Sequence, residues 1–132
     1  MQTTIVMFAI LLVVSLVVSI SRGTFASSQF GQLAERYPLT DKEPESFRYI
    51  QSGVVNGLCF NGTLALCITT SHLHIMTTFP MPRRGPAAIP LRDLSITATK
   101  THLRYTAIHI RNSEWTIGLE SGWIRQLQAF QR

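Results

Sequence analysis

The sequence predicts an N-terminal transmembrane α-helix followed by a small, mainly β domain, in which about seven antiparallel strands form a barrel that a C-terminal helix caps. Three observations support this prediction. Residues 1–21 contain no charged side chain and no histidine. From Phe47 onward, apolar residues recur with a period of two, which is typical of half-buried strands. Residues 121–130 then return to a helical period.

The N-terminal run is long enough to cross a membrane once. Residues 5–20 read IVMFAILLVVSLVVSI, and the 21 uncharged residues span about 31 Å as a helix, close to a hydrocarbon thickness of about 30 Å. A cleaved signal peptide is the alternative, since Thr24-Phe25-Ala26 places small residues before Ser27. No basic residue precedes the run, however, and the run exceeds a typical signal core. We therefore expect residues 1–21 to be an uncleaved anchor.

The charges beside this run predict its orientation. Arg22, Arg36 and Lys42 all follow it, and basic residues close to a transmembrane helix favour the cytoplasmic side. Residues 22–132 are therefore expected in the cytoplasm, attached to the membrane by a single helix. The alternative is a secreted or periplasmic β domain that is released by cleavage after Ala26.

Residues 22–46 are predicted to be a juxtamembrane linker with one short helix. This helix is indicated by apolar residues at i, i+3, i+4 and i+7, namely Phe30, Leu33, Ala34 and Tyr37. Pro38 ends the pattern. A later proline with charges around it marks the start of the folded domain, residues 47–132.

The domain is predicted to contain short strands that alternate with turns. The strands are expected at residues 47–55, 63–68, 72–76, 87–96, 97–103, 105–111 and 115–119. The turns are expected at Asn61-Gly62, at residues 69–71 and at residues 111–114. Pro90 donates no backbone hydrogen bond, so its strand is expected at a sheet edge or a bulge.

A short amphipathic helix is predicted to follow the last strand. Its apolar stripe consists of Trp123, Ile124, Leu127 and Phe130. Ser121 is a suitable N-cap because its hydroxyl can accept a hydrogen bond from a free backbone N–H. A helix that carries Trp and Phe is well suited to cover the open end of a curled sheet.

Three motifs in this frame resemble those of small, uncharacterised bacterial single-pass membrane proteins with a pleckstrin-homology-like (GRAM-like) soluble domain. They are Leu33-Ala34-Glu35-Arg36-Tyr37-Pro38, then His72-Leu73-His74-Ile75, then residues 79–86 with Ile89-Pro90-Leu91. His72 replaces a usual Gly, and Leu91 replaces a usual Trp. The resemblance implies a pleckstrin-homology-like barrel with a capping helix at a membrane. It implies no reaction, because none is assigned to that group.

Two histidines are the candidate metal ligands. His72 and His74 stand at i and i+2 of a strand, so they share a face, and His102 and His109 could complete a zinc site. Nothing in the sequence requires these residues to meet, and polar residues on the outer face of a strand are the ordinary pattern. We therefore expect a solvated outer face and no cofactor.

The two cysteines are not expected to form a disulfide. If Asn61-Gly62 were the hairpin turn, Cys59 would pair with Leu64 and share its face, whereas Cys67 would lie on the opposite face. Free thiols in a reducing compartment are the resulting expectation.

The distribution of charge carries the functional prediction. Residues 83–132 hold eight basic and three acidic residues, a net charge of +5, whereas residues 22–82 hold four of each sign. A basic surface close to a bilayer attracts anionic head groups by about 1 kcal/mol per basic residue. Arg83 and Arg84 lie in a proline-rich loop, residues 80–86, that can hold both guanidinium groups outward. They are the predicted contact residues.

The sequence therefore predicts a non-enzymatic binding or scaffold module at the membrane surface. The expected partners are anionic lipid head groups or an unidentified membrane protein, and nucleic acid is not expected. No nucleophile elbow, P-loop or paired-carboxylate motif is present. A metal-dependent enzyme that uses His72 and His74 is the alternative.

Overall fold

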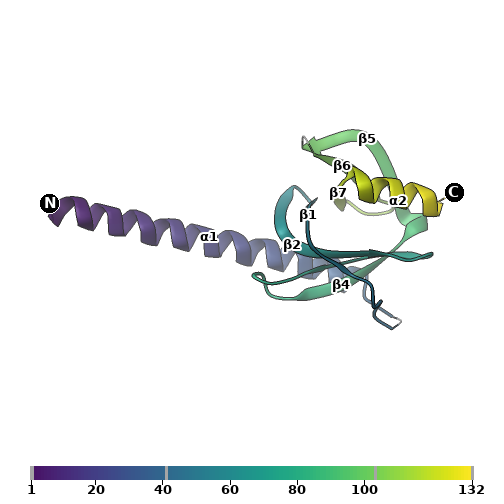
Figure 1. Cartoon of the computed structure of the whole chain (residues 1–132), viewed down its shortest axis with the longest axis horizontal. Coiled ribbons are helices and arrows are strands. Elements are labelled where there is room, and N and C mark those ends of the chain that lie inside the picture. Colours follow the sequence, from purple (N-terminus) through teal and green to yellow (C-terminus); the bar gives the residue numbers. More distant parts are fainter. Residues whose placement is uncertain (1, 41, 103, 132) are drawn as a thin grey trace.

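The computed structural model describes residues 2–40, 42–102 and 104–131, with the backbone alone for residues 22–24 and 97–102. Within these residues a long helix, α1 (Gln2–Arg36), leads into a β domain that ends in a second helix, α2 (Ser121–Gln131) (Figure 1). The strands are β1 (Arg48–Val55), β2 (Leu58–Ile68), β3 (His72–Thr77), β4 (Arg84–Pro90), β5 (Leu94–His102), β6 (Tyr105–Ile110) and β7 (Thr116–Glu120). A 3-10 turn, η1 (Leu91–Asp93), separates β4 from β5.

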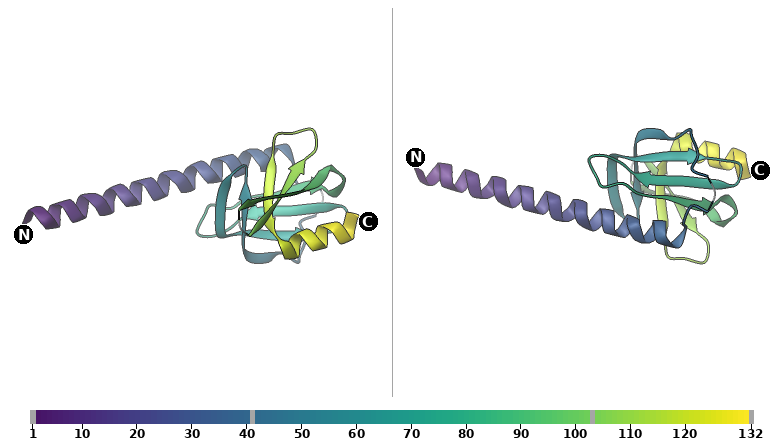
Figure 2. Two further views of the ribbon diagram at one scale, coloured as in Figure 1. Left: turned by 90° about the horizontal axis from the view of Figure 1, so that it is seen from above. Right: turned by 90° about the horizontal axis from the view of Figure 1, so that it is seen from below.

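The described strands form one antiparallel sheet in the order β4-β3-β2-β1-β7-β6-β5, which curls into a half-barrel (Figure 2). The predicted seven antiparallel strands are confirmed. The seam between β1 and β7 consists of two residue pairs, Val54 with Gly118 and Val55 with Ile117. A Cβ on Gly53 would lie 2.9 Å from the carbonyl oxygen of Gly118, so this close approach requires a glycine.

Helix α1 is longer than the sequence indicated. The prediction of a separate short helix beginning at Phe30 is wrong, because one continuous helix runs from Gln2 to Arg36. Phe30 and Leu33 are fully buried in the core of the β domain, and such packing stabilises a helix whose Gly, Ser and Thr residues have low intrinsic propensity. The helix ends just before Pro38, as predicted.

The hairpin turn between β1 and β2 is not at the predicted position. Val55 pairs with Leu58, so the turn is Asn56-Gly57, whose φ values of 49° and 79° suit a type I′ turn. The predicted turn, Asn61-Gly62, lies inside β2 where the register with β1 shifts. Gly62 has a φ of 68° there, and its backbone N–H donates to Ser52 Oγ at 2.8 Å. Asn61-Gly62 therefore forms part of a bulge.

The predicted strand over residues 87–96 is interrupted. β4 ends at Pro90, η1 turns the chain, and β5 begins at Leu94. Because β4 and β5 are the two edges of the sheet, this short turn brings the edges together at one end of the half-barrel. The edge position predicted from Pro90 is confirmed. The predicted turns at residues 69–71 and 111–114 are also present.

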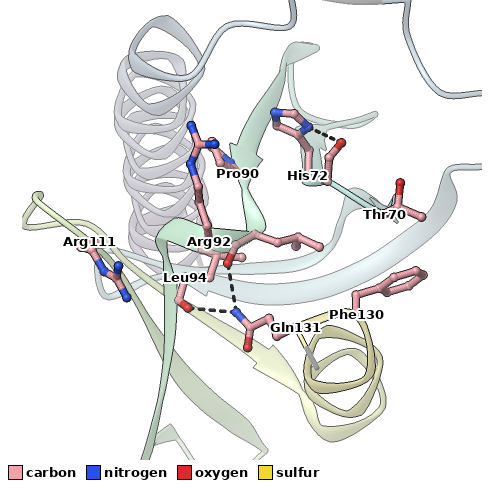
Figure 3. A pocket seen from close by; sticks show the side chains of 10 residues that line it. Thr70, His72, Pro90, Arg92, Leu94, Arg111, Phe130 and Gln131 are labelled. Atoms are coloured by element: carbon pink, nitrogen blue, oxygen red, sulfur yellow. Dashed lines mark hydrogen bonds between the residues drawn. The ribbon is translucent and has the colours of Figure 1, made fainter.

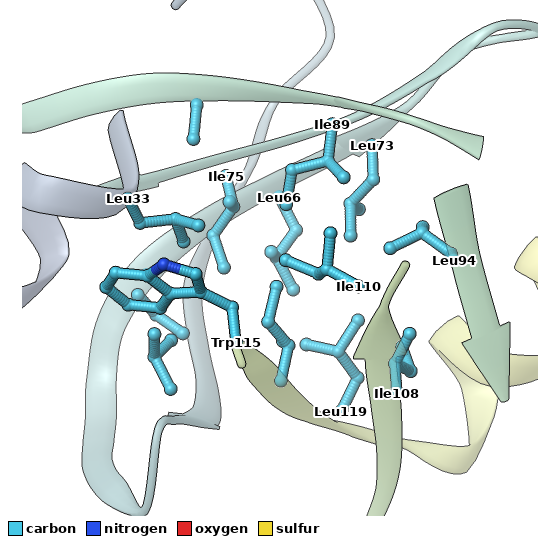
Figure 4. Packing of buried hydrophobic residues seen from close by; sticks show 14 of the residues in the cluster. Leu33, Leu66, Leu73, Ile75, Ile89, Leu94, Ile108, Ile110, Trp115 and Leu119 are labelled. Carbon is cyan, nitrogen blue, oxygen red and sulfur yellow. The ribbon is translucent and has the colours of Figure 1, made fainter. Parts of the chain in front are cut away.

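The core lies inside the curl of the sheet, where apolar residues from most of its strands meet (Figure 4). The largest fully buried side chains of the strands are Leu64, Leu66, Leu73, Ile75, Ile89, Ile108, Ile110, Ile117 and Leu119, together with Phe60. α1 adds Phe30 and Leu33, and α2 adds Trp123, Ile124 and Leu127. Phe130, which is predicted to belong to the same apolar stripe, is 43% exposed because it lies near the end of α2, after the last buried residue, Leu127.

Trp123 is expected to stabilise the domain strongly. Its indole N–H donates to Gln51 Oε1 at 3.1 Å, and the guanidinium of Arg48 lies 5.7 Å from its ring centre. Trp123→Ala should lower the free energy of unfolding by about 3–5 kcal/mol, the usual effect of emptying a large core site. Denaturant unfolding of the full chain in a mild detergent measures this change. Phe130→Ala is the exposed control, and an equal midpoint for both variants would contradict the structural role of Trp123.

Candidate functional site

The predicted contact residues lie where β3 turns into β4. Arg83 is the last residue of the β3–β4 loop (residues 78–83), and Arg84 is the first residue of β4. The base of this loop is held by Thr77, whose buried hydroxyl donates to the Pro82 carbonyl at 2.7 Å and accepts from the Arg84 backbone N–H at 2.9 Å. Sequence reasoning missed Thr77, because a threonine at a strand end carries no recognisable signal.

Each arginine contacts a side chain of α1 or of the connection that follows it. Arg83 Nη2 lies 2.7 Å from Glu43 Oε1, and both side chains are exposed. Arg84 Nε donates to Ser27 Oγ of α1 at 3.3 Å. An exposed ion pair contributes at most about 1 kcal/mol, so Arg83 can exchange Glu43 for another anion at little cost. Arg84 faces a neutral partner, and its charge is not compensated by that contact.

Arg83 and Arg84 lie beside the part of α1 that follows its apolar segment (residues 5–20). Among the described residues, α1 is the one helix long and apolar enough to span a membrane, and the large side chains of this segment are exposed. Ser27 follows Ile20 by seven residues, which corresponds to about 10 Å along a helix. Arg84 therefore sits about 10 Å beyond the end of the apolar segment.

β4 runs alongside α1 in the same direction. Arg84, at the start of β4, contacts Ser27. Near the end of β4, the Ala88 backbone N–H donates to the Tyr37 carbonyl at 2.8 Å, and Pro38 pairs with Ala87. The loop that precedes β4 consequently points back toward the apolar segment, as Figures 1 and 2 show.

The two candidate metal ligands do lie side by side. The ring centres of His72 and His74 are 5.9 Å apart. His72 is half-buried and its Nδ1 lies 2.7 Å from Ser71 Oγ. Within the described chain, no group of three or more His, Cys, Asp or Glu residues is placed to hold a metal ion. His109 lies on β6, four strands away in the sheet order, and the side chain of His102 is outside the described part.

The prediction of a solvated outer face is wrong for His74, which is 6% exposed. Pro38 pairs with the edge strand β4, and Arg48 is the first residue of β1. Because β3 and β2 lie between these two strands in the sheet, the connection from Pro38 to Arg48 crosses the outer face. Phe47, at the end of this connection, packs edge-on against the His74 ring with centres 6.4 Å apart. His74 Nδ1 is buried and has no hydrogen-bond partner among the described atoms. Burial, and secondly the nearby His72, lower the pKa of His74.

The two cysteines lie in the same strand, β2. Cys59 is exposed near the start of the strand, and Cys67 is buried near its end. Eight residues of strand separate them by on the order of 20 Å or more, which excludes a disulfide between them. Burial raises the pKa of the Cys67 thiol, which therefore stays protonated and unreactive.

A concave surface lies at the end of the β domain that is far from the apolar segment. It has a volume of about 620 Å³ and is lined by the β2–β3 turn, η1 and the last turn of α2 (Figure 3). Arg92 and Arg111 contribute positive charge, but Figure 3 shows them extending to different sides of η1. Gln131 is occupied in hydrogen bonds to the carbonyls of Leu91 and Leu94. The two guanidinium groups do not converge on one ligand position.

Comparisons with models of protein families, with curated proteins and with solved structures found no match. A helix apolar enough to span a membrane is joined to a curled, seven-stranded antiparallel sheet of the described residues and to a C-terminal helix. The arginines at the start of β4 lie on the side of the domain that is nearest the apolar segment.

The buried His74 should make stability depend on pH. Its pKa is lowered in the folded chain, so the unfolded chain binds more protons between the folded value and the ordinary value of about 6.5. The contribution of neutral His74 to the free energy of unfolding should therefore be fully present above about pH 6.5, and it should decrease as the pH falls toward the folded pKa of His74. Unfolding measured between about pH 8 and pH 5 checks this. His74→Phe should weaken the dependence, and His109→Gln should preserve it. An unchanged dependence in His74→Phe would refute the assignment.

Proposed function

We propose that this chain is a single-pass membrane protein whose β domain is a non-enzymatic, pleckstrin-homology-like binding module held at the cytoplasmic surface of the bilayer. In this proposal Arg83 and Arg84 contact anionic lipid head groups. The observation that carries it is the continuity of α1, which runs without a break from the apolar segment into the core of the domain.

The geometry of α1 supports a position of Arg84 close to the head-group region. The polar layers add about 5–7 Å on each side of the hydrocarbon core. If the 21 uncharged residues fill that core, Ser27 and its partner Arg84 lie about 9 Å beyond its edge, a few ångströms outside the head groups. An arginine side chain can reach back several ångströms to a phosphate oxygen.

The balance of charge also supports the proposal. The Arg83–Glu43 pair is exposed and contributes at most about 1 kcal/mol, which is similar to the attraction of one basic residue to an anionic surface. Exchange of the carboxylate for a lipid phosphate is therefore nearly neutral for Arg83. Arg84 requires no exchange, because its partner is a neutral hydroxyl.

The strand order and the C-terminal helix are compatible with the pleckstrin-homology-like resemblance, although such a fold does not by itself specify a ligand. Arg22 and Arg36 lie on the domain side of the apolar segment and favour a cytoplasmic domain. The metal-enzyme alternative has only His72 and His74 together, and the structure brings no third ligand of the described residues to them.

The placement is tested by a C-terminal fusion to alkaline phosphatase, which becomes active only outside the cytoplasm. We expect low phosphatase activity, because the basic residues beside the apolar segment retain the domain in the cytoplasm. We also expect the mass of the mature protein to include residues 1–26. High activity would refute the cytoplasmic orientation, and loss of the N-terminal mass would refute the anchor.

Lipid selectivity tests the binding function. The full chain is reconstituted into vesicles, and energy transfer from Trp115 and Trp123 to a dansyl-labelled lipid reports which lipids gather around the domain. Anionic dansyl lipid should be enriched over a neutral one. Arg83→Ala combined with Arg84→Ala should reduce this enrichment by roughly fivefold, the effect of about 1 kcal/mol from Arg84, because the lipid contact of Arg83 is nearly offset by the loss of its contact with Glu43.

The matched control is Arg92→Ala combined with Arg111→Ala. It removes two exposed arginines from the other end of β4 and should retain the enrichment. Added salt should weaken the effect in the wild-type chain. Equal enrichment in both double variants would show that Arg83 and Arg84 are not the contact residues.

A further inference from the structure

We infer that the β3–β4 loop is a second membrane contact, which places the ring of Phe79 in the same bilayer that holds α1. This inference rests on the proposed membrane function and adds a specific apolar contact to it. It begins from the exposure of Phe79, whose side chain is 90% exposed. A single exposed apolar side chain is ordinary on a protein surface, so Phe79 indicates a contact only through its position near the apolar segment of α1.

The loop presents Phe79 at a defined place. The Thr78 backbone N–H donates to the Thr63 carbonyl at 2.7 Å, and the Met81 N–H donates to the Thr78 carbonyl at 3.0 Å. Met81 packs partly against the core, while Phe79 points away from it. The hydroxyl of Thr77 ties together the two ends of the loop. These contacts anchor the loop and leave the Phe79 ring outside.

The direction of the loop brings Phe79 toward the apolar segment. β3 pairs with β4 through Thr77 and Arg84, and Arg84 contacts Ser27 of α1. Phe79 lies two residues beyond Thr77 in the direction of the helix N-terminus, which covers up to about 7 Å. This nearly offsets the distance of about 10 Å between Ser27 and the end of the apolar segment. The loop therefore ends close to the head-group layer, and the ring of Phe79 extends into that layer.

A bilayer is the partner that fits this position. Its surface must lie beside the loop if α1 spans it, because the helix and the loop are parts of one packed unit. Aromatic rings favour the interface between hydrocarbon and head groups. Arg83 and Arg84 follow Phe79 closely in sequence, and an apolar group flanked by basic groups is typical of interfacial binding to anionic lipid.

The experiment measures the depth of three positions in the full chain reconstituted into vesicles. The background is Cys59→Ser, in which the remaining Cys67 is buried and should take up almost no label. Single cysteines are introduced as Val18→Cys, Phe79→Cys and Thr70→Cys, and each is labelled with an environment-sensitive dye. All three native side chains are exposed, so the labels should not disturb the core. Lipids that carry a nitroxide near the head group or deep in the chain quench the dye.

Val18 reports whether α1 is embedded, and Thr70 marks the far end of the domain. We expect a dye at Val18 to be quenched by the deep nitroxide, and a dye at Thr70 to be quenched by neither. A dye at Phe79 should be quenched by the shallow nitroxide several-fold more than a dye at Thr70. Quenching at Val18 with no difference between Phe79 and Thr70 would overturn this inference and leave the membrane anchor intact. No quenching at Val18 would overturn the proposed function and this inference together.

Discussion

Phe30 and Leu33, on the last turns of α1, are fully buried among the strands of the β domain. The ring of Phe30 meets that of Phe60 edge-on, with centres 6.0 Å apart, and burial of each such side chain contributes about 1.5–3 kcal/mol. The helical hydrogen bonds of α1 continue from this contact to the apolar segment. The orientation of the apolar segment therefore fixes the orientation of the β domain. The contact between Arg84 and Ser27 likewise fixes the position of β4 along α1.

The curled sheet makes this arrangement possible. Its two edge strands, β4 and β5, are joined by the short turn η1 at one end, while α1 and α2 supply buried side chains to the same core. α1 and the Pro38 pairing cover the edge strand β4, which therefore does not expose a long row of unpaired backbone groups. The connection between Pro38 and Arg48 crosses the outer face, which explains why His74 is buried on the side of β3 that faces away from the core.

The candidate site follows from the alignment of β4 with α1 rather than from a sequence motif. Arg83 and Arg84 could be identified from the sequence, because adjacent arginines among prolines are conspicuous. Their distance from the apolar segment could not, since it depends on which residue of α1 lies beside β4. The structure selects Ser27. The role of Phe79 depends on the same contact, because in the sequence a phenylalanine after a strand is equally compatible with a place in the core.

By itself the sequence determined the local elements: the apolar segment, seven strands within the described residues, two of the three predicted turns, the edge position of Pro90 and the helix from Ser121. Each is encoded in neighbouring residues through charge, periodicity or turn chemistry. Only the tertiary structure decided which of two Asn-Gly pairs is the hairpin turn, whether α1 continues to Arg36 and whether His74 is buried. Those outcomes depend on packing between residues that are distant in sequence. Only the assembled core favours a bulge at Gly62, the burial of Phe30 and the packing of the Pro38–Arg48 connection on the outer face of β3.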